Sequence, residues 1–162
     1  MPDYQLEKTV WTDADFDLMS WHDATLWSMV ADPDAFLFLL DLDYIFQWVP
    51  PEPNETYFKF WVAPVTMVFE NAHTIGIDIH SAQGHIEIAG LYREAPALTP
   101  NGAFTEHTYH FECREGDVRI RATGFKMFVR RPPSLLGVQS FSLAERSGVS
   151  FSRNVGDPGV IS

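Results

Sequence analysis

The stretch Tyr-His-Phe-Glu-Cys-Arg-Glu-Gly-Asp-Val-Arg-Ile-Arg-Ala, residues 109–122, decides the fold class of this chain. Apolar and polar residues alternate on both sides of Glu115-Gly116, as they do in two antiparallel strands joined by a turn. With Cys113 opposite Val118, Glu112 faces Arg119 across the hairpin, and the apolar residues share the other face. The alternation therefore predicts a hairpin with a buried face made of Tyr109, Phe111, Cys113, Val118, Ile120 and Ala122.

The same period-two pattern continues along the chain and predicts strands near 22–30, 36–47, 57–69, 74–80, 85–93, 104–114, 117–129, 137–143 and 148–152. Thr12 or Asp13 can cap a short helical turn over residues 12–18. We therefore expect an all-β antiparallel sandwich or half-open barrel of about eight to ten strands with a short N-terminal helical turn. It would form one domain over residues 1–153, followed by a flexible C-terminal tail at 154–162.

Acidic residues are concentrated in the first part of the chain. Residues 1–60 hold twelve carboxylates against Lys8 and Lys59, a net charge of −10 out of −11 for all 162 residues. If these acids cluster in space, they repel nucleic acid and anionic membranes and attract basic partners or cations. The charge therefore argues against a nucleic-acid partner or a membrane partner and favours a basic protein.

Several classes of protein are excluded or left without support by the sequence. Met1–Lys8 has neither a basic start nor an apolar core, and no apolar run is long enough to span a membrane, so we expect a cytoplasmic protein. Cys113 has no second cysteine with which to pair, and its strand pattern indicates a buried residue. There is no glycine-flanked nucleophile and no phosphate-binding loop, so the sequence establishes no enzyme.

The strand predicted over residues 36–47 begins with an unusual run, Phe36-Leu37-Phe38-Leu39-Leu40, which is apolar on both faces. An antiparallel sheet usually leaves one face in water, so Leu37 and Leu39 need a second cover. The N-terminal segment, the other sheet of a sandwich, or the same strand of a second subunit could supply it. A homodimer through residues 36–47 is one of these three alternatives.

The first candidate site joins Trp21-His22-Asp23 to Asp41-Leu42-Asp43. A hairpin turn at Asp32-Pro33-Asp34, with Leu26 opposite Leu39, would set His22 beside Asp41 and Asp43. One nitrogen and two oxygen ligands could bind a small molecule or an ion, although a paired histidine with solvated carboxylates is the structural alternative. Trp11, Trp21 and Trp48 lie at strand edges, where they could either rim a ligand pocket or pack in the core.

The second candidate site is a predicted hairpin over residues 74–89. A four-residue loop, Ser81-Ala82-Gln83-Gly84, would set His80 opposite His85 and Asp78 opposite Glu87. Two imidazoles and two carboxylates on one face could bind zinc or another divalent metal, with a carboxylate as base toward bound water. The alternative is an ordinary solvent-exposed face that binds no ion.

Two functional hypotheses follow from these features. The first is a binding module that presents the acidic N-terminal half to a basic protein partner and needs no cofactor. The second is a small-molecule-binding or divalent-metal-binding β-domain, or a metal-dependent enzyme, that uses one of the His/Asp/Glu clusters. The sequence favours the first hypothesis because it contains no catalytic motif.

Overall fold

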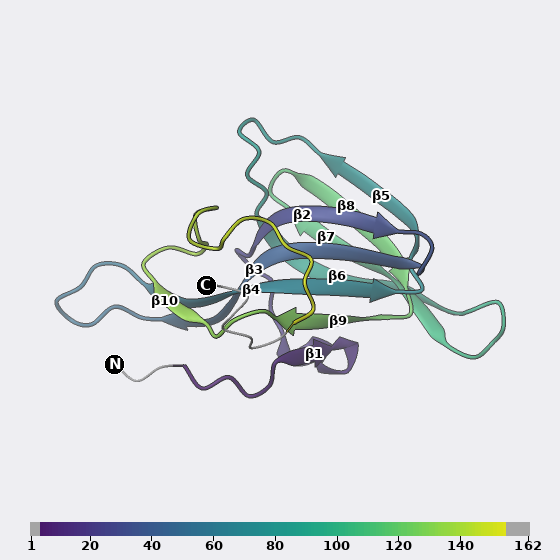
Figure 1. Cartoon of the computed structure of the whole chain (residues 1–162), viewed down its shortest axis with the longest axis horizontal. Coiled ribbons are helices and arrows are strands. Elements are labelled where there is room, and N and C mark those ends of the chain that lie inside the picture. The colour runs from purple at the N-terminus through teal and green to yellow at the C-terminus, as the bar shows by residue number, and fades with distance from the viewer. Residues whose placement is uncertain (1–3, 155–162) are drawn as a thin grey trace.

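The computed structural model describes residues 4–154, which form two antiparallel β-sheets packed face to face (Figure 1). The larger sheet contains six strands: β1 (Val10–Thr12), β2 (Thr25–Asp32), β3 (Leu37–Val49), β4 (Lys59–Glu70), β9 (Gly124–Val129) and β10 (Ser134–Leu136). The smaller sheet contains four: β5 (His73–Ile79), β6 (Ile88–Leu98), β7 (Thr105–Cys113) and β8 (Gly116–Ala122). The expected all-β antiparallel fold is therefore confirmed, and its form is a β-sandwich.

The strand order explains where the core lies. The larger sheet runs β1-β9-β4-β3-β2, with β10 paired to β4, and the smaller sheet runs β5-β8-β7-β6. Alternate residues of β3 point between the sheets, where Leu40 and Leu42 are fully buried. They meet Phe111 of β7 and Phe125 of β9, which are also fully buried. Each such side chain contributes about 1.5–3 kcal/mol when it leaves water.

The chain passes from one sheet to the other at two tight corners, which fixes the sheets relative to each other. The chain bends between β4 and β5 at Asn71-Ala72 and between β8 and β9 at Thr123. The Thr123 amide donates to the Glu70 carbonyl at 3.0 Å, and Asn71 adopts a φ of 51°, a left-handed conformation that asparagine tolerates. The predicted strand 117–129 is thus two strands, broken at this corner.

The sheets are also joined along the edge formed by β2 and the start of β6. The Leu26 amide donates to the Ile86 carbonyl at 2.9 Å, and the Ile88 amide donates to the Ala24 carbonyl at 2.8 Å. The hairpin predicted over residues 74–89 is therefore wrong, because β5 pairs with β8 and lies at the opposite edge of the smaller sheet from β6. The alternating isoleucines correctly indicated two strands, but such a pattern does not determine which strand each one pairs with.

The hairpin of β7 and β8 has the predicted faces in a different register. Cys113 lies opposite Gly116, not Val118, so the pairing is shifted by two residues and the predicted Glu112–Arg119 pair is wrong. Glu112 instead faces Asp117. Because side chains repeat every two residues along a strand, the shift leaves the apolar face unchanged. All six predicted face residues are buried.

The hairpin of β2 and β3 also differs from its predicted register. Leu26 lies opposite Leu42 rather than Leu39, and a bulge at Trp27 shifts the pairing again before Ser28 meets Asp41. The predicted proximity of His22 to Asp43 is therefore wrong, because Thr25 lies opposite Asp43. A bulge adds one residue to one strand, and period-two alternation does not reveal it.

The second face of β3 is covered by the C-terminal part of the chain, residues 137–154. This segment contains no strand, so the strands predicted at 137–143 and 148–152 are wrong. It crosses the outer face of the larger sheet (Figure 1), and the Ser150 amide donates to Asp41 there at 2.9 Å. On the same face Leu39 is 6% exposed. The C-terminal segment was not among the three covers expected for Leu37 and Leu39, and a homodimer through residues 36–47 remains an untested prediction.

The expected N-terminal helical turn is present as a 3-10 helix, η1 (Asp13–Leu18). The Thr12 hydroxyl accepts from the Ala14 amide, and the Asp15 carboxylate accepts from the Thr12 amide at 3.0 Å. No helix within residues 4–154 is long and apolar enough to cross a membrane. Of the tail expected at 154–162, all but Asn154 lies outside the described residues.

The environment of Cys113 predicts an unreactive thiol. Burial raises its pKa to about 12, and the carboxylates of Glu115, Asp117 and Glu112 add to the increase. Because the thiolate is the reacting species, we expect the native protein to resist a disulfide reagent at pH 8. The same protein in denaturant should react fully. Fast labelling of the native chain, measured by absorbance, would contradict this description of the core.

Candidate functional site

A buried cluster of four charged side chains lies between the outer face of β3 and the C-terminal segment. Arg146 binds Asp41 in a bidentate pair, with both N–O distances 2.7 Å. Arg146 Nε donates to Asp43 at 3.1 Å, and Arg130 donates to Asp41 at 2.8 Å and to Thr66 at 2.8 Å. Both aspartates are completely buried, and both arginines are less than 5% exposed. We call these four charged residues the buried ion network.

Other donors complete the bonding of the two aspartates. Trp27 Nε1 donates to Asp43 at 2.9 Å, and the backbone amide of Phe141 donates to the same oxygen at 3.0 Å. Burial is the largest influence on the pKa of Asp43 and raises it above its ordinary value, against the opposing effect of Arg146 and these donors. Since Asp41 and Asp43 are both sealed from solvent, neither can receive a ligand in this state of the protein.

The other residues of the first predicted site are dispersed. Trp21 is buried in the core, where its ring meets Tyr44 edge-on at 6.0 Å. Trp11 is partly buried and lies 6.2 Å from the ring of Phe46. His22 and Trp48 do come together, with ring centroids 6.0 Å apart at the surface. Trp11 also lines a cavity of about 320 Å³, and Trp21 and His22 line another of about 170 Å³, so the predicted residues face separate cavities rather than one site.

His22 and Trp48 belong to an exposed aromatic group at one end of the β3–β4 pair. Trp48 is 40% exposed, Phe58 45% and Tyr57 79%, and the Trp48 ring lies 6.1 Å from that of Phe58. Phe60 is buried beneath them, 5.0 Å from Trp48. Figure 1 shows the loop between β3 and β4 projecting beyond the sheets at this end. We call His22, Trp48, Tyr57 and Phe58 the hairpin tip.

The residues of the predicted metal site are not brought together. Asp78 and His80 are exposed near the end of β5, 3.3 Å apart, whereas Glu87 is paired with Arg114 beside β6. His85 is exposed in the loop between these strands. Among residues 4–154 no group of three or more His, Cys, Asp or Glu side chains is arranged to hold a metal ion. The metal hypothesis therefore has no geometric support from the hairpin on which it was based.

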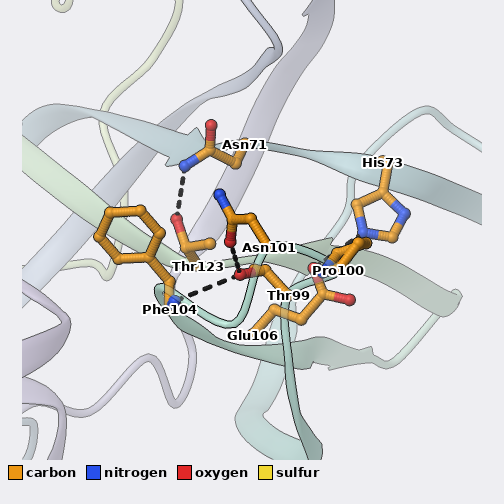
Figure 2. Close-up of a pocket in the computed structure, with 8 residues that line it drawn as sticks. All are labelled: Asn71, His73, Thr99, Pro100, Asn101, Phe104, Glu106 and Thr123. Atoms are coloured by element: carbon orange, nitrogen blue, oxygen red, sulfur yellow. Dashed lines mark hydrogen bonds and ion pairs between the residues drawn. The ribbon is translucent and has the colours of Figure 1, made fainter.

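A cavity of about 400 Å³ opens at the other end of β4, beside the corner between the sheets (Figure 2). Asn71 and His73 come from this corner, Asn101 and Phe104 from the loop between β6 and β7, and Glu106 from β7. Figure 2 shows Phe104 and His73 on opposite sides, with the two asparagines between them. We call this cavity the corner pocket.

Protein partners hold the polar groups of the corner pocket in place. Glu106 accepts from His73 at 3.0 Å and from Arg121 at 3.1 Å. The bond from His73, followed by that from Arg121, holds the pKa of Glu106 below its ordinary value, so the carboxylate is ionised at neutral pH. The other His73 nitrogen lies 2.8 Å from the Thr74 hydroxyl. The pocket thus contains one carboxylate whose charge is balanced by an arginine.

None of the pocket residues was predicted from the sequence as a site residue. His73 and Glu106 are 33 residues apart, and Asn71, Asn101 and Phe104 belong to loops with no recognised motif. Only Asn101-Gly102 gave a local signal, because that dipeptide marks a turn. The pocket residues meet only because the chain bends between the two sheets. Their spacing in the sequence gives no sign of that bend.

The acidic residues of the N-terminal half do not form one patch. Asp32 ends β2 and Asp34 lies in the turn before β3, whereas Glu52 and Glu55 lie in the loop after β3, at the far end of this 13-residue strand. The buried aspartates are neutralised by arginine. The exposed negative charge is therefore spread over both ends of the larger sheet.

Removing one charge from the buried ion network should strongly destabilise the fold. Asp41→Asn leaves Arg130 and Arg146 buried with one carboxylate fewer, and breaking such a pair costs about 3–5 kcal/mol. Urea unfolding followed by tryptophan fluorescence measures the free energy. Asp34→Asn, at an exposed turn residue, is the control and should stay within about 0.5 kcal/mol of wild type. A loss below 1 kcal/mol for Asp41→Asn, as an order of magnitude, would contradict a sealed network.

Replacing both histidines of the predicted metal site should have little effect. Their side chains are exposed in the loop between β5 and β6 and belong to no group of three or more metal-ligating side chains among residues 4–154, so we expect His80→Ala with His85→Ala to change the free energy of unfolding by at most about 0.5 kcal/mol. Thermal melts with and without added zinc make the measurement. A zinc-dependent increase in melting temperature that the double variant abolishes would restore the metal hypothesis.

No family model, no curated protein and no solved structure matches this chain.

Proposed function

We propose that this protein is an interaction module that binds a basic protein partner through the hairpin tip. The observation that carries the proposal is the group of exposed aromatic side chains at the end of β3 and β4. Trp48, Tyr57 and Phe58 are large side chains that folding leaves in contact with water. Tryptophan and tyrosine are the residues that most often dominate binding energy at protein interfaces.

The surroundings of the hairpin tip favour a basic partner. Glu52 and Glu55 are exposed in the loop that links Trp48 to Tyr57; Glu55 forms an ion pair with Lys59 at 3.0 Å, so Glu52 supplies the carboxylate at the rim of the aromatic centre. Such a polar rim around an apolar centre is typical of interfaces between separately folded proteins. The net charge of −11 would speed the approach of a positively charged protein over long distances.

The location of the tip is also suited to recognition. It lies at the end of a long strand pair whose other residues are mostly buried, so the presenting scaffold is rigid. Phe60, 7% exposed, supports the Trp48 ring from below, which limits the freedom lost when a partner binds. Binding at the hairpin tip would depend on apolar contact and on complementary charge. The proposed function therefore requires no cofactor.

Affinity capture with a matched control tests the proposal. Tagged full-length protein is used to capture partners from an extract of its own cells, and the bound proteins are identified by mass spectrometry. We expect a basic protein that is retained at low salt and released at high salt, because salt screens exposed charges. The variant Trp48→Ala, Tyr57→Ala, Phe58→Ala should lose it, whereas Phe104→Ala, which removes an exposed aromatic elsewhere, should retain it.

A quantitative measurement with the purified partner follows. The triple variant should weaken the affinity by at least about tenfold, since truncating one interface anchor typically costs more than 1 kcal/mol. Glu52→Lys should mainly slow association, because a rim charge acts on encounter. Circular dichroism and thermal melts establish that each variant is folded. Retention of the partner by a folded triple variant, or capture of an acidic partner only, would sink the proposal.

A further inference from the structure

We infer that the corner pocket is a binding site for a neutral sugar of one or two rings. This inference is independent of the proposed function, because the pocket lies at the opposite end of β4 from the hairpin tip. A volume of about 400 Å³ falls within the range of small-molecule sites.

The pocket offers a flat apolar surface next to polar groups. Phe104 is 58% exposed, although it lines a cavity rather than the core. One face of a sugar ring carries C–H groups that can pack on an aromatic ring, while its hydroxyls remain available for hydrogen bonds. Fused aromatic bases could also stack there, so the choice between these ligands depends on the polar groups.

Those polar groups include a free donor and an acceptor. The Asn101 carbonyl oxygen accepts from the Thr99 hydroxyl at 2.6 Å and from the Ala103 amide at 3.0 Å. Its amide nitrogen is thereby left for a ligand, and Figure 2 shows it directed toward Asn71. Glu106, an acceptor, also lines the pocket. A hydroxyl group both donates and accepts, so neighbouring hydroxyls of one ring can satisfy such a mixed set.

The charge balance favours a neutral ligand. The Glu106 carboxylate forms an ion pair with Arg121, whose Nη1 also donates to the Ala95 carbonyl. His73 binds the other carboxylate oxygen. An anionic ligand would meet Glu106, and a cationic one would compete with an arginine that is already in place. A neutral ring with several hydroxyl groups is neither repelled by Glu106 nor in competition with Arg121.

Backbone in the left-handed region occurs at and beside the pocket: Asn71 lines it, Thr74 follows the lining residue His73, and the Ala95 carbonyl accepts from Arg121, the partner of Glu106. Asn71, Thr74 and Ala95 all adopt φ near 50°, and they account for three of the six non-glycine residues with positive φ within residues 4–154. Thr74 is β-branched, which makes this conformation especially unfavourable, and it lies in a bulge of β5. Strained residues and bulges gather at binding sites, where they set side chains in place for a ligand.

Titration of the full-length ¹⁵N-labelled protein by NMR tests this inference. The probes are D-glucose, D-galactose, N-acetyl-D-glucosamine and, as a competing class, adenosine. We expect at least one sugar to cause saturable shifts at the amides of residues 99–106 and 71–73. Adenosine should cause none. Shifts confined to the hairpin tip, or no saturable shift with any of the three sugars, would overturn the inference, as would binding of adenosine alone.

Two variants separate recognition from folding. Asn101→Asp keeps the acceptor for Thr99 and Ala103, removes the free donor and adds a carboxylate to a pocket that already holds Glu106, so it should weaken the sugar at least about tenfold in a folded loop. Phe104→Ala should weaken it to a similar extent, and Phe58→Ala, at the hairpin tip, should leave it unchanged. Unaltered sugar affinity in a folded Asn101→Asp protein would show that the pocket does not recognise sugar hydroxyl groups through Asn101.

Discussion

The bidentate pair between Asp41 and Arg146 is the interaction on which the rest of this structure depends. It joins the centre of β3 to a C-terminal segment that has no strand of its own. Arg130, at the end of β9, binds the same carboxylate, so three distant parts of the chain meet at one residue. In a dry interior each of these charges would be costly alone, and the network is stable because every member has a partner.

The network also explains how a sheet with two apolar faces exists in a single chain. One face of β3 packs into the sandwich core through Leu40 and Leu42. The other face combines Leu39 with the two aspartates, and the segment over residues 137–154 covers it with backbone donors from Phe141 and Ser150. Directional bonds to buried carboxylates thus hold an irregular segment in which Val138, Leu143 and Val149 remain exposed.

The accessible chemistry lies at the two ends of the β4 strand, away from this network. At one end the polar groups of the corner pocket are fixed by the bend between the sheets. At the other, the loop between β3 and β4 carries exposed aromatic residues supported by Phe60. Both features use the same rigid strand pair, and both combine an aromatic surface with carboxylates.

Alternation in the sequence determined which residues face the core, because side-chain direction along a strand is a local property of the backbone. Tyr109, Phe111, Val118 and Ile120 are buried as that pattern predicts, and Thr12 caps the 3-10 helix as its residue type predicts. Strand partners, registers and sites were decided only by the tertiary structure. A two-residue shift of β8 preserves every face, and β5 pairs with β8 because packing, not sequence proximity, selects its neighbour. Asp41 and Asp43 form part of the interior for the same reason: their arginines lie about ninety and a hundred residues away, and only the folded chain brings those charges together.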